Sequence, residues 1–468
     1  MKKWVIPGES DYTSPVKFPY KIILTACVII FVLFITYNVL TWPQDKKVTD
    51  DLFFNAFTIP AMVCFGLWCM VAAVCRMLSF PFHYANNLES YGKHVWQSWA
   101  IESLVLLNHS SLSPVPDLSL KIQKLEGEAL ISPATPLKIN IEYDVMNGSR
   151  IAETLFQLIE PVKDSLSRGG YPFQTWLYVK NSDESIRDVF IDALSKLKIT
   201  VDKIGTIHFL DKCPDYSSVN KWIDQEMREN NILITIELHD ENNSDFYETA
   251  HVFVFTDQRM LNENDKPAYL LRMMNSTNYH LAKTVNAYLS AKQVQIEKIR
   301  RLWTSSLDKQ SKFILYGEVD NAKTGILADS RYELEKVTGQ GSDVQNWTLL
   351  ALAIDATEHG QGHQIIATSE ADNVHVGLVT AKNPGYWNEP YFFDVIFYAF
   401  FTIALAVIPF IFVFVDLVPS SFAENSPWLF FGALMMMIIF ILVTLMYSFH
   451  LFIEMIHKDF GFSHPNYR

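Results

Sequence analysis

The chain has 468 residues, of which 49% are apolar, and its formal net charge at pH 7 is −13. That length allows two or three globular units. The acidic balance argues against nucleic acid as a partner, because a nucleic-acid-binding protein needs a basic surface. An acidic domain is also repelled mildly by an anionic membrane surface, so any attachment to a lipid bilayer must come from apolar segments.

Four uncharged apolar segments are long enough to cross a hydrocarbon core of about 30 Å as helices. Two lie near the N-terminus and two near the C-terminus, at residues 22–42, 53–75, 395–415 and 428–449. The first is too long for a cleaved signal peptide and has no small-residue cleavage site after it. We therefore expect an N-terminal tail and transmembrane hairpin over residues 1–80, and a C-terminal transmembrane hairpin and tail over 391–468.

Basic residues predict the orientation of these helices, because lysine and arginine mark the cytoplasmic ends of membrane segments. They lie before the first segment, after the second and after the fourth: Lys2, Lys3, Lys17, Lys21, Arg76, Lys458 and Arg468. The tip at 416–427 contains two acidic residues and no basic one, as expected for an exported loop, whereas the short tip at 43–52 is mixed. Both termini and the region between about residues 81 and 390 should thus face the cytoplasm.

Cysteine usage agrees with that compartment. Four of the five cysteines lie in the first two apolar segments, where a thiol behaves as a small hydrophobic group. Only Cys213 belongs to the region between the hairpins, so this region can form no internal disulfide, and nothing in it resembles a cysteine-based zinc site.

The region between the hairpins begins with a connecting segment at 81–135, which is interrupted by proline and serine. Strand and helix patterns then alternate through a first half, 136–260, and a second half, 261–390. In the first half we expect strands at 138–145 and 175–180 and helices at 150–166 and 182–197. In the second half we expect strands at 268–274 and 312–319 and helices at 279–307 and 330–337. This order predicts an α/β domain with helices packed on a sheet.

A helix followed by a two-stranded hairpin occurs twice, at about 219–256 and again at about 346–380. The offset of about 130 residues is the size of half a domain, which predicts two similar α/β halves. In the second copy, residues 349–354 are apolar in succession, and a helix that is apolar all round must be buried on every side.

Two α/β halves, each with a hairpin and a buried helix, resemble the thiolase fold, the five-layered architecture of β-ketoacyl synthases. The resemblance implies a nucleophilic cysteine at the start of the first buried helix and activating histidines from the second half. Cys213 lies just before that helix, next to the turn-forming Pro214. It is either an acyl-transfer nucleophile, with His359 and His363 as base and oxyanion donor, or a loop thiol, which is the interpretation we favour.

Glu358, His359 and His363 form the densest group of reactive side chains in the chain. Two histidines four residues apart could be metal ligands on one helical turn. However, Gly360 and Gly362 lie between them, and glycines so placed end a helix. We favour a helix C-terminus, where a histidine interacts well with the helix dipole. The sequence therefore leads us to assign no catalytic, cofactor-binding or metal-binding residues and no enzymatic activity.

The peptides "IPGESDYTSPVKFPYKIILT" and "ALAIDATEHGQGHQIIATSEADNVHVGLVT" and the overall layout resemble the lipase-adaptor family of bacterial type VI secretion systems. That resemblance implies an inner-membrane adaptor that binds a phospholipase effector in the cytoplasm and transfers it to the spike protein. The C-terminal hairpin departs from the layout of the family. Two alternatives stay open: a membrane-associated acyl-transfer enzyme of thiolase-like fold, and an immunity or envelope-assembly protein in which the membrane part acts.

Overall fold

The computed structural model describes residues 4–7, 17–44, 47, 50–127, 130, 135–143, 149–167, 172–225, 230–240, 244–256, 261–263, 265–339 and 344–385. The chain divides into two compact units, which we describe separately. The α/β unit comprises residues 1–6 and 93–388, and the helical unit comprises 7–92 and 389–468. The expected C-terminal hairpin, with segments 395–415 and 428–449, lies outside the described residues.

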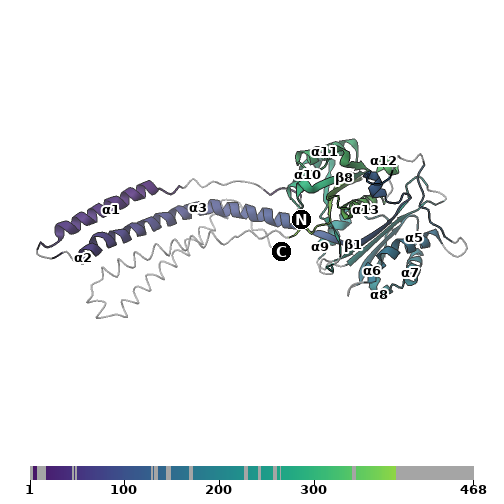
Figure 1. The fold of residues 1–468 in the computed structure, drawn as a ribbon, viewed down its shortest axis with the longest axis horizontal. Helices are drawn as coiled ribbons and strands as arrows, with labels where there is room; N and C mark the ends of the chain where they lie inside the picture. Colours follow the sequence, from purple (N-terminus) through teal and green to yellow (C-terminus); the bar gives the residue numbers. More distant parts are fainter. Residues whose placement is uncertain are drawn as a thin grey trace. The chain divides into compact units, whose positions relative to one another are not determined.

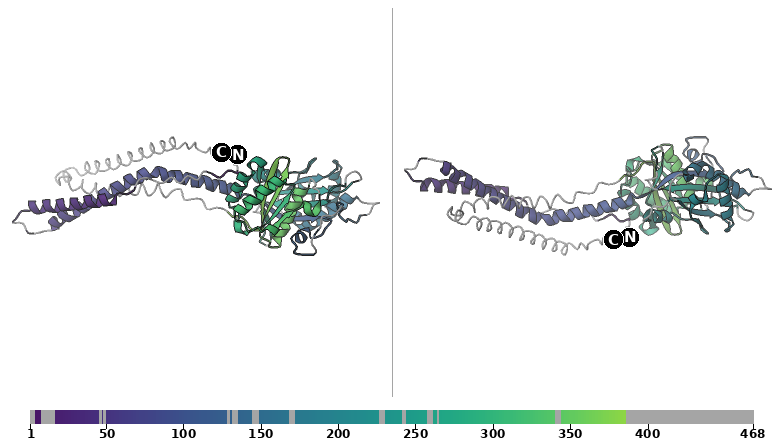
Figure 2. Two further views of the ribbon diagram at one scale, coloured as in Figure 1. Left: turned by 90° about the horizontal axis from the view of Figure 1, so that it is seen from above. Right: turned by 90° about the horizontal axis from the view of Figure 1, so that it is seen from below.

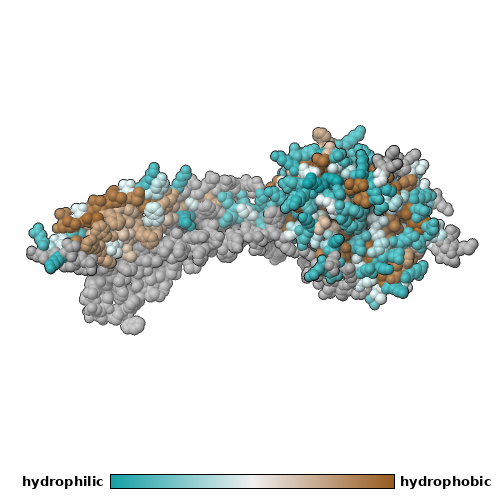
Figure 3. Space-filling view, in the orientation of Figure 1, coloured by the Kyte–Doolittle hydropathy of each residue, from teal (hydrophilic) through white to brown (hydrophobic). Residues whose placement is uncertain are grey.

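In the helical unit, α1 (Tyr20–Thr41) is followed by α2 (Asp50–Phe53), the π-helix η1 (Phe54–Thr58) and α3 (Ile59–Ala100). Tyr20–Thr41 and Phe54–Arg76 are long and apolar enough to cross a bilayer, and only 6% and 24% of these segments are buried. Figure 3 shows apolar side chains gathered along α1. The expected segments 22–42 and 53–75 are therefore helical. Their length and composition fit either a membrane anchor or a signal sequence.

The α/β unit is built on one mixed sheet of 11 strands among the described residues. The strands are β1 (Ser103–Leu112), β2 (Phe173–Val179), β3 (Ile207–Phe209), β4 (Asn230–Glu237), β5 (Thr249–Thr256), β6 (Ala268–Leu271), β7 (Met274–Thr277), β8 (Ile299–Ser305), β9 (Arg331–Glu333), β10 (His363–Glu370) and β11 (Asn373–Thr380). Their order is β3-β2-β4-β5-β1-β6-β11-β10-β8-β9, with β7 paired to β11.

The sheet repeats one pattern. In the first half β2 is parallel to β3 and β4, and β4 is antiparallel to β5. In the second half β8 is parallel to β9 and β10, and β10 is antiparallel to β11. The two halves share one sheet because β1 pairs with both β5 and β6. The segment 81–135, expected to be a connection, thus supplies a central strand.

Helices cover both outer faces of the sheet and fill the space between its halves. In one outer apolar core, α5 (Arg150–Ile159), α6 (Lys163–Ser167) and α7 (Ile186–Lys196) pack on β2, β4 and β5. In the other, α10 (Leu281–Ser290) and α11 (Lys309–Asn321) pack on β8, β10 and β11. Between the halves lie α4 (Leu118–Ile122), α9 (Ser217–Asp224) and α13 (Gln345–Glu358). The two halves of the sheet form separate layers, so the unit has five layers, helix, sheet, helix, sheet and helix, and Figure 1 shows α13 between the outer helix groups.

The two views of Figure 2 show the same arrangement, with the green second half packed beside the teal first half. α13 lies at the centre of the layers, and its residues from Trp347 to Ile354 are all buried. The prediction of a helix buried on every side is therefore confirmed. It ends at Glu358, before Gly360 adopts a φ of +73°, so the prediction that glycines end the helix is also confirmed.

Four element predictions are wrong. The described part of 138–145 contains no strand. The expected helix at 279–307 is α10 followed by β8, and the expected helix at 330–337 is β9 followed by the short α12 (Glu335–Thr338). The expected strand at 312–319 is α11, because the Asp308 carboxylate caps it by accepting a hydrogen bond from Ser311 N at 2.6 Å. Its buried residues then recur at helical spacing: Ser311, Leu315 and Val319.

Candidate functional site

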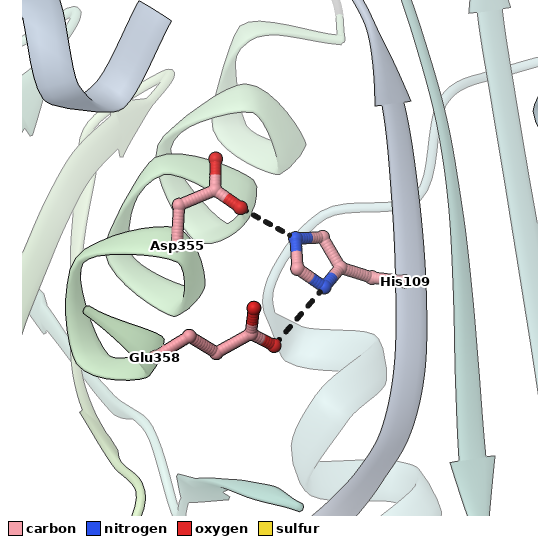
Figure 4. A group of neighbouring side chains, drawn as sticks. All are labelled: His109, Asp355 and Glu358. Atoms are coloured by element: carbon pink, nitrogen blue, oxygen red, sulfur yellow. Dashed lines mark hydrogen bonds and ion pairs between the residues drawn. The ribbon is translucent and has the colours of Figure 1, made fainter. Parts of the chain in front are cut away.

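One histidine of β1 meets two carboxylates of α13. His109 faces α13, and its ring stacks on Phe253 of β5 with 6.3 Å between ring centroids. Asp355 and Glu358 are three residues apart on the helix, so both point to the same side. Nε2 of His109 lies 2.9 Å from Oδ1 of Asp355, and Nδ1 lies 3.7 Å from Oε1 of Glu358 (Figure 4). We call these three residues the His109 cluster.

The cluster favours a positively charged imidazole. The side chain of His109 is only 8% exposed. Burial by itself would lower its pKa, but the hydrogen bond and charge of Asp355, with the charge of Glu358, raise the pKa above its ordinary value. Burial also raises the pKa of Glu358, although the charge of His109 opposes this shift. The arrangement thus stabilises the protonated form of the imidazole between two carboxylates.

A histidine and two carboxylates could also hold a metal, since their ligand atoms all lie within 4.8 Å of one another. In a metal centre, one ring nitrogen faces the ion together with the other ligands, while the second nitrogen donates to an outer group. Here the two carboxylates take opposite nitrogens of His109. This geometry fits an ion-pair cluster better than a metal centre.

The His109 cluster borders a pocket of about 500 Å³, which is also lined by Ser111, His251 and Thr348. Nδ1 of His251 lies 2.9 Å from Oγ of Ser111, and Nε2 lies 2.9 Å from Oγ1 of Thr348. Burial, aided by the charge of His109, lowers the pKa of His251 to about 3. The pocket therefore holds, on neighbouring strands, one histidine whose pKa is raised and one whose pKa is lowered, a separation typical of acid and base roles.

The structure separates the residues that the sequence analysis considered together. Glu358 belongs to the His109 cluster, but the next residue, His359, uses Nδ1 to donate to Asp355 O at 2.7 Å at the end of α13. His363 begins β10 beside β8, and burial, with the charges of Lys382 and Lys298, lowers its pKa. The two histidines thus have different environments.

Cys213 lies at the opposite end of α13. It is buried, and its neighbour Pro214 accepts a hydrogen bond at 2.8 Å from Nε1 of Trp347, in the first turn of that helix. His359 follows the last turn, 12 residues later, which is about 18 Å at 1.5 Å per residue. The structure therefore does not bring Cys213 to His359, as the acyl-transfer hypothesis required.

Sequence reasoning missed the residues that do meet. His109 and Asp355 are 246 positions apart, and His109 stands in a segment interpreted as a connection. A second group, Asp215, Glu370 and His375, also brings its ligand atoms within 4.8 Å of one another, and we call it the His375 cluster. Only the pairing of strands and the position of α13 bring these residues together, so no local motif could have revealed them.

No protein-family model matches the chain, and no curated protein matches its sequence. Among solved structures, the chain is similar to the oxazolomycin ketosynthase domain of Streptomyces albus, with 9% identity, a TM-score of 0.42, and coverage of 62% of this chain and 98% of that one. It is also similar to the type II polyketide ketosynthase AntDE in complex with its acyl-carrier protein AntF (10%, 0.43, 60% and 99%) and to a variant of OleA from Xanthomonas campestris (8%, 0.39, 60% and 99%). At these TM-scores the likeness carries no argument about function.

Proposed function

We propose that the chain is a membrane-tethered adaptor whose α/β unit binds another protein. The observation that carries this proposal is a pair of exposed aromatic side chains, Tyr279 and Phe313, which are 90% and 81% exposed. Large aromatic residues on a protein surface are enriched where partners dock. We call this pair the Tyr279–Phe313 surface.

The two aromatic residues belong to adjoining elements. Tyr279 lies in η4 (Asn278–His280), directly before α10, and Phe313 lies in the first turns of α11. Asn278 joins the elements: its amide donates to Asp308 Oδ2 at 3.2 Å, and it accepts from Ser311 Oγ at 2.7 Å. These bonds join the two segments that carry the aromatic residues, and such preorganisation lowers the entropy cost of binding.

The helix α3 supports the proposed membrane tether. The apolar stretch Phe54–Arg76 continues within α3 to Trp96 and Ala100, which are buried in the core of the α/β unit. In this proposal the helical unit lies in a bacterial inner membrane, and the α/β unit faces the cytoplasm. The resemblance stated from the sequence supplies the partner, a phospholipase effector of a type VI secretion system that is passed to the spike protein.

The test is affinity capture with the full chain, extracted in detergent from the cell that produces it. We expect mass spectrometry to identify a lipase-type effector or a spike protein, and we expect the double variant Tyr279→Ser, Phe313→Ser to lose it. Leu327→Ser is a matched control, because Leu327 is also an exposed apolar residue but follows the C-terminal end of α11. Recovery of neither protein by the wild-type chain would contradict the proposal.

A second candidate function, acyl transfer from an ester to water, is favoured by the pocket beside the His109 cluster. Thr348 directs its hydroxyl to Val344 O at 3.5 Å, so Nε2–H of His251 donates to Thr348, and Nδ1 is left to accept from the Ser111 hydroxyl. A serine hydroxyl on a neutral imidazole is the arrangement of an activated nucleophile, although an imidazole with so low a pKa is a weak base.

Ester hydrolysis by the purified full chain tests this second function. We expect Ser111→Ala to abolish any activity, whereas Ser113→Ala should leave it unchanged. Ser113 also lines the pocket, but its hydroxyl donates to Val115 O. Equal hydrolysis by wild type and Ser111→Ala would exclude Ser111 as the nucleophile.

A further inference from the structure

The His375 cluster brings together three elements near the beginning of α13. Asp215 stands just before α9, Glu370 ends β10 and His375 lies on β11. His375 pairs with Thr368 across the β10–β11 hairpin, and Glu370 is two residues beyond Thr368. Because side chains two apart on a strand share a face, Glu370 and His375 point to the same side of the hairpin.

The imidazole of His375 is buried without a hydrogen bond. The residue is 3% exposed, and within the described part of the chain neither ring nitrogen has a hydrogen-bond partner. Its nearest polar neighbours are the carboxylates of Asp215 and Glu370, with ligand atoms within 4.8 Å. The ring of His375 therefore lies beside two carboxylates with a nitrogen that is available to an ion.

The charges around His375 suit a cation. Asp215 and Glu370 supply two negative charges beside the ring of His375, whose uncharged form offers a lone pair to an ion. The Asp215 carboxylate is held in place, because its Oδ1 accepts hydrogen bonds from Ser217 N at 3.1 Å and Ser217 Oγ at 2.5 Å. The only cation paired with Glu370 in the described part of the chain is the exposed Lys212, at 2.7 Å.

The backbone around the cluster is also fixed. Pro214 O accepts from Nε1 of Trp347 at 2.8 Å, and the hydroxyl of Tyr216 donates to Asn346 O. The side chain of Asn346 in turn accepts from Oγ1 of Thr368 at 2.5 Å. These bonds join the loop that carries Asp215 to α13 and to β10, so all three residues of the cluster are positioned by the same framework.

We propose that Asp215, Glu370 and His375 bind one divalent transition-metal ion, with zinc as the preferred ion. One imidazole nitrogen and two carboxylate oxygens form a ligand set for zinc or a similar ion, whereas magnesium and calcium prefer oxygen ligands alone. Metal–ligand distances of about 2.0–2.2 Å allow an ion to bridge atoms that are too far apart to hydrogen-bond. A water molecule completes the coordination. The ion links Asp215 of the first half to the hairpin of the second, and this role is independent of the adaptor function.

Zinc binding to the full chain in detergent tests the proposal. The protein is stripped with a chelator and dialysed against zinc; bound metal is then measured by mass spectrometry, and affinity by competition with a chromogenic chelator. We expect one zinc ion per chain and at least about a tenfold loss of affinity in His375→Gln and in Glu370→Gln, with folding checked by circular dichroism. His359→Gln is the matched control, since His359 is exposed at the other end of α13 and should leave binding unchanged.

The variant Lys212→Met is expected to raise the affinity for zinc rather than lower it. It removes the ammonium group that competes with the ion for Glu370, so zinc should bind several-fold more tightly. Absence of zinc from the wild-type chain would overturn the proposal. Equal zinc content in wild type and in both the His375→Gln and Glu370→Gln variants would also overturn it, because the metal would then be adventitious.

Discussion

A histidine, an aspartate and a glutamate meet near each end of α13, but the pKa of the histidine is shifted in opposite directions in the two clusters. In the His109 cluster, both ring nitrogens face a carboxylate oxygen, at 2.9 and 3.7 Å, and the pKa of the histidine is raised. In the His375 cluster, the ring has no hydrogen bond among the described residues, and its pKa is lowered. A histidine beside two acidic residues can therefore form different kinds of site. The distances between ring nitrogens and carboxylate oxygens, together with burial, decide whether the group forms an ion pair or a metal-ligand set.

The difference follows from the elements that supply the residues. Asp355 and Glu358 are one turn apart on one helix, so the ring of His109 enters between them. Asp215 and Glu370 come from a loop and a strand end, which hold their carboxylates farther from the ring of His375. If the comparison is correct, changes to the two clusters must have different consequences for stability, pH dependence and metal binding.

The largest expected effect on stability comes from removing a buried side chain of α13, the helix near whose ends both clusters lie. Trp347 is fully buried in α13, and Trp347→Ala should lower the free energy of unfolding by about 3–5 kcal/mol. Trp347→Phe keeps most of the packing but leaves Pro214 O unpaired, so we expect about 1–3 kcal/mol. Thermal unfolding in detergent measures both. A loss below about 1 kcal/mol for Trp347→Ala would show that α13 is not the common core.

The next effect compares the histidines directly in zinc-free protein. His109→Gln removes the partner of two carboxylates and should destabilise the chain by about 1.5–3 kcal/mol, the value of hydrogen bonds to charged groups. His375→Gln removes a ring that makes no hydrogen bond and should cost less. Unfolding curves of the two variants, recorded in parallel, provide the measurement. If His375→Gln were the more destabilising substitution, the comparison would fail.

The pH dependence should differ in sign. Because the pKa of His109 is raised on folding, its contribution to stability is complete below about pH 6.5, the unfolded value, and is lost as the pH rises through the folded pKa. The pKa of His375 is lowered, so its contribution is complete above about pH 6.5 and is lost as the pH falls. Relative to wild type, His109→Gln should therefore be most destabilising at acidic pH. An equal difference from pH 5 to pH 9 would contradict the charged state of His109.

The smallest effect distinguishes the two acids of the His109 cluster. Glu358 is 46% exposed and 3.7 Å from the ring, so Glu358→Gln should cost at most about 0.5 kcal/mol, as for a surface ion pair. Asp355 accepts the 2.9 Å hydrogen bond, and Asp355→Asn should cost about 1 kcal/mol, since the side chain is 35% exposed. Unfolding of the two variants ranks them. The reverse order would assign the main bond to Glu358.

Periodicity in the sequence predicted the α/β class, the repeated helix and hairpin, and the buried helix α13. It failed where the local residue types favour one secondary structure but capping, packing or strand pairing imposes another. The aromatic and β-branched residues at 312–319 indicated a strand, but the Asp308 cap and the packing of Leu315 and Val319 make it helical. The strand β8 was hidden because "IRRLWTS" follows a helical pattern, and its parallel pairing with β9 and β10 makes it a strand.

The sites were less predictable than the fold. Glu358 was noticed because it stands beside two histidines in the sequence, yet its partner is His109, 249 positions away by residue number. Likewise His375 was part of a strand pattern, and nothing local connected it to Asp215. Both clusters depend on how the halves pack against α13, which a single sequence does not reveal.

The central claim of a cytoplasmic adaptor domain tethered to the inner membrane is tested most directly by its topology. Alkaline phosphatase, which is active only outside the cytoplasm, can be fused after residues 48, 260 and 422. We expect activity at 48 and 422, in the two predicted exported tips, and none at 260, within the α/β unit. Activity from the fusion at 260 would place that unit outside the cytoplasm, contradict the adaptor proposal and favour an immunity or envelope-assembly role.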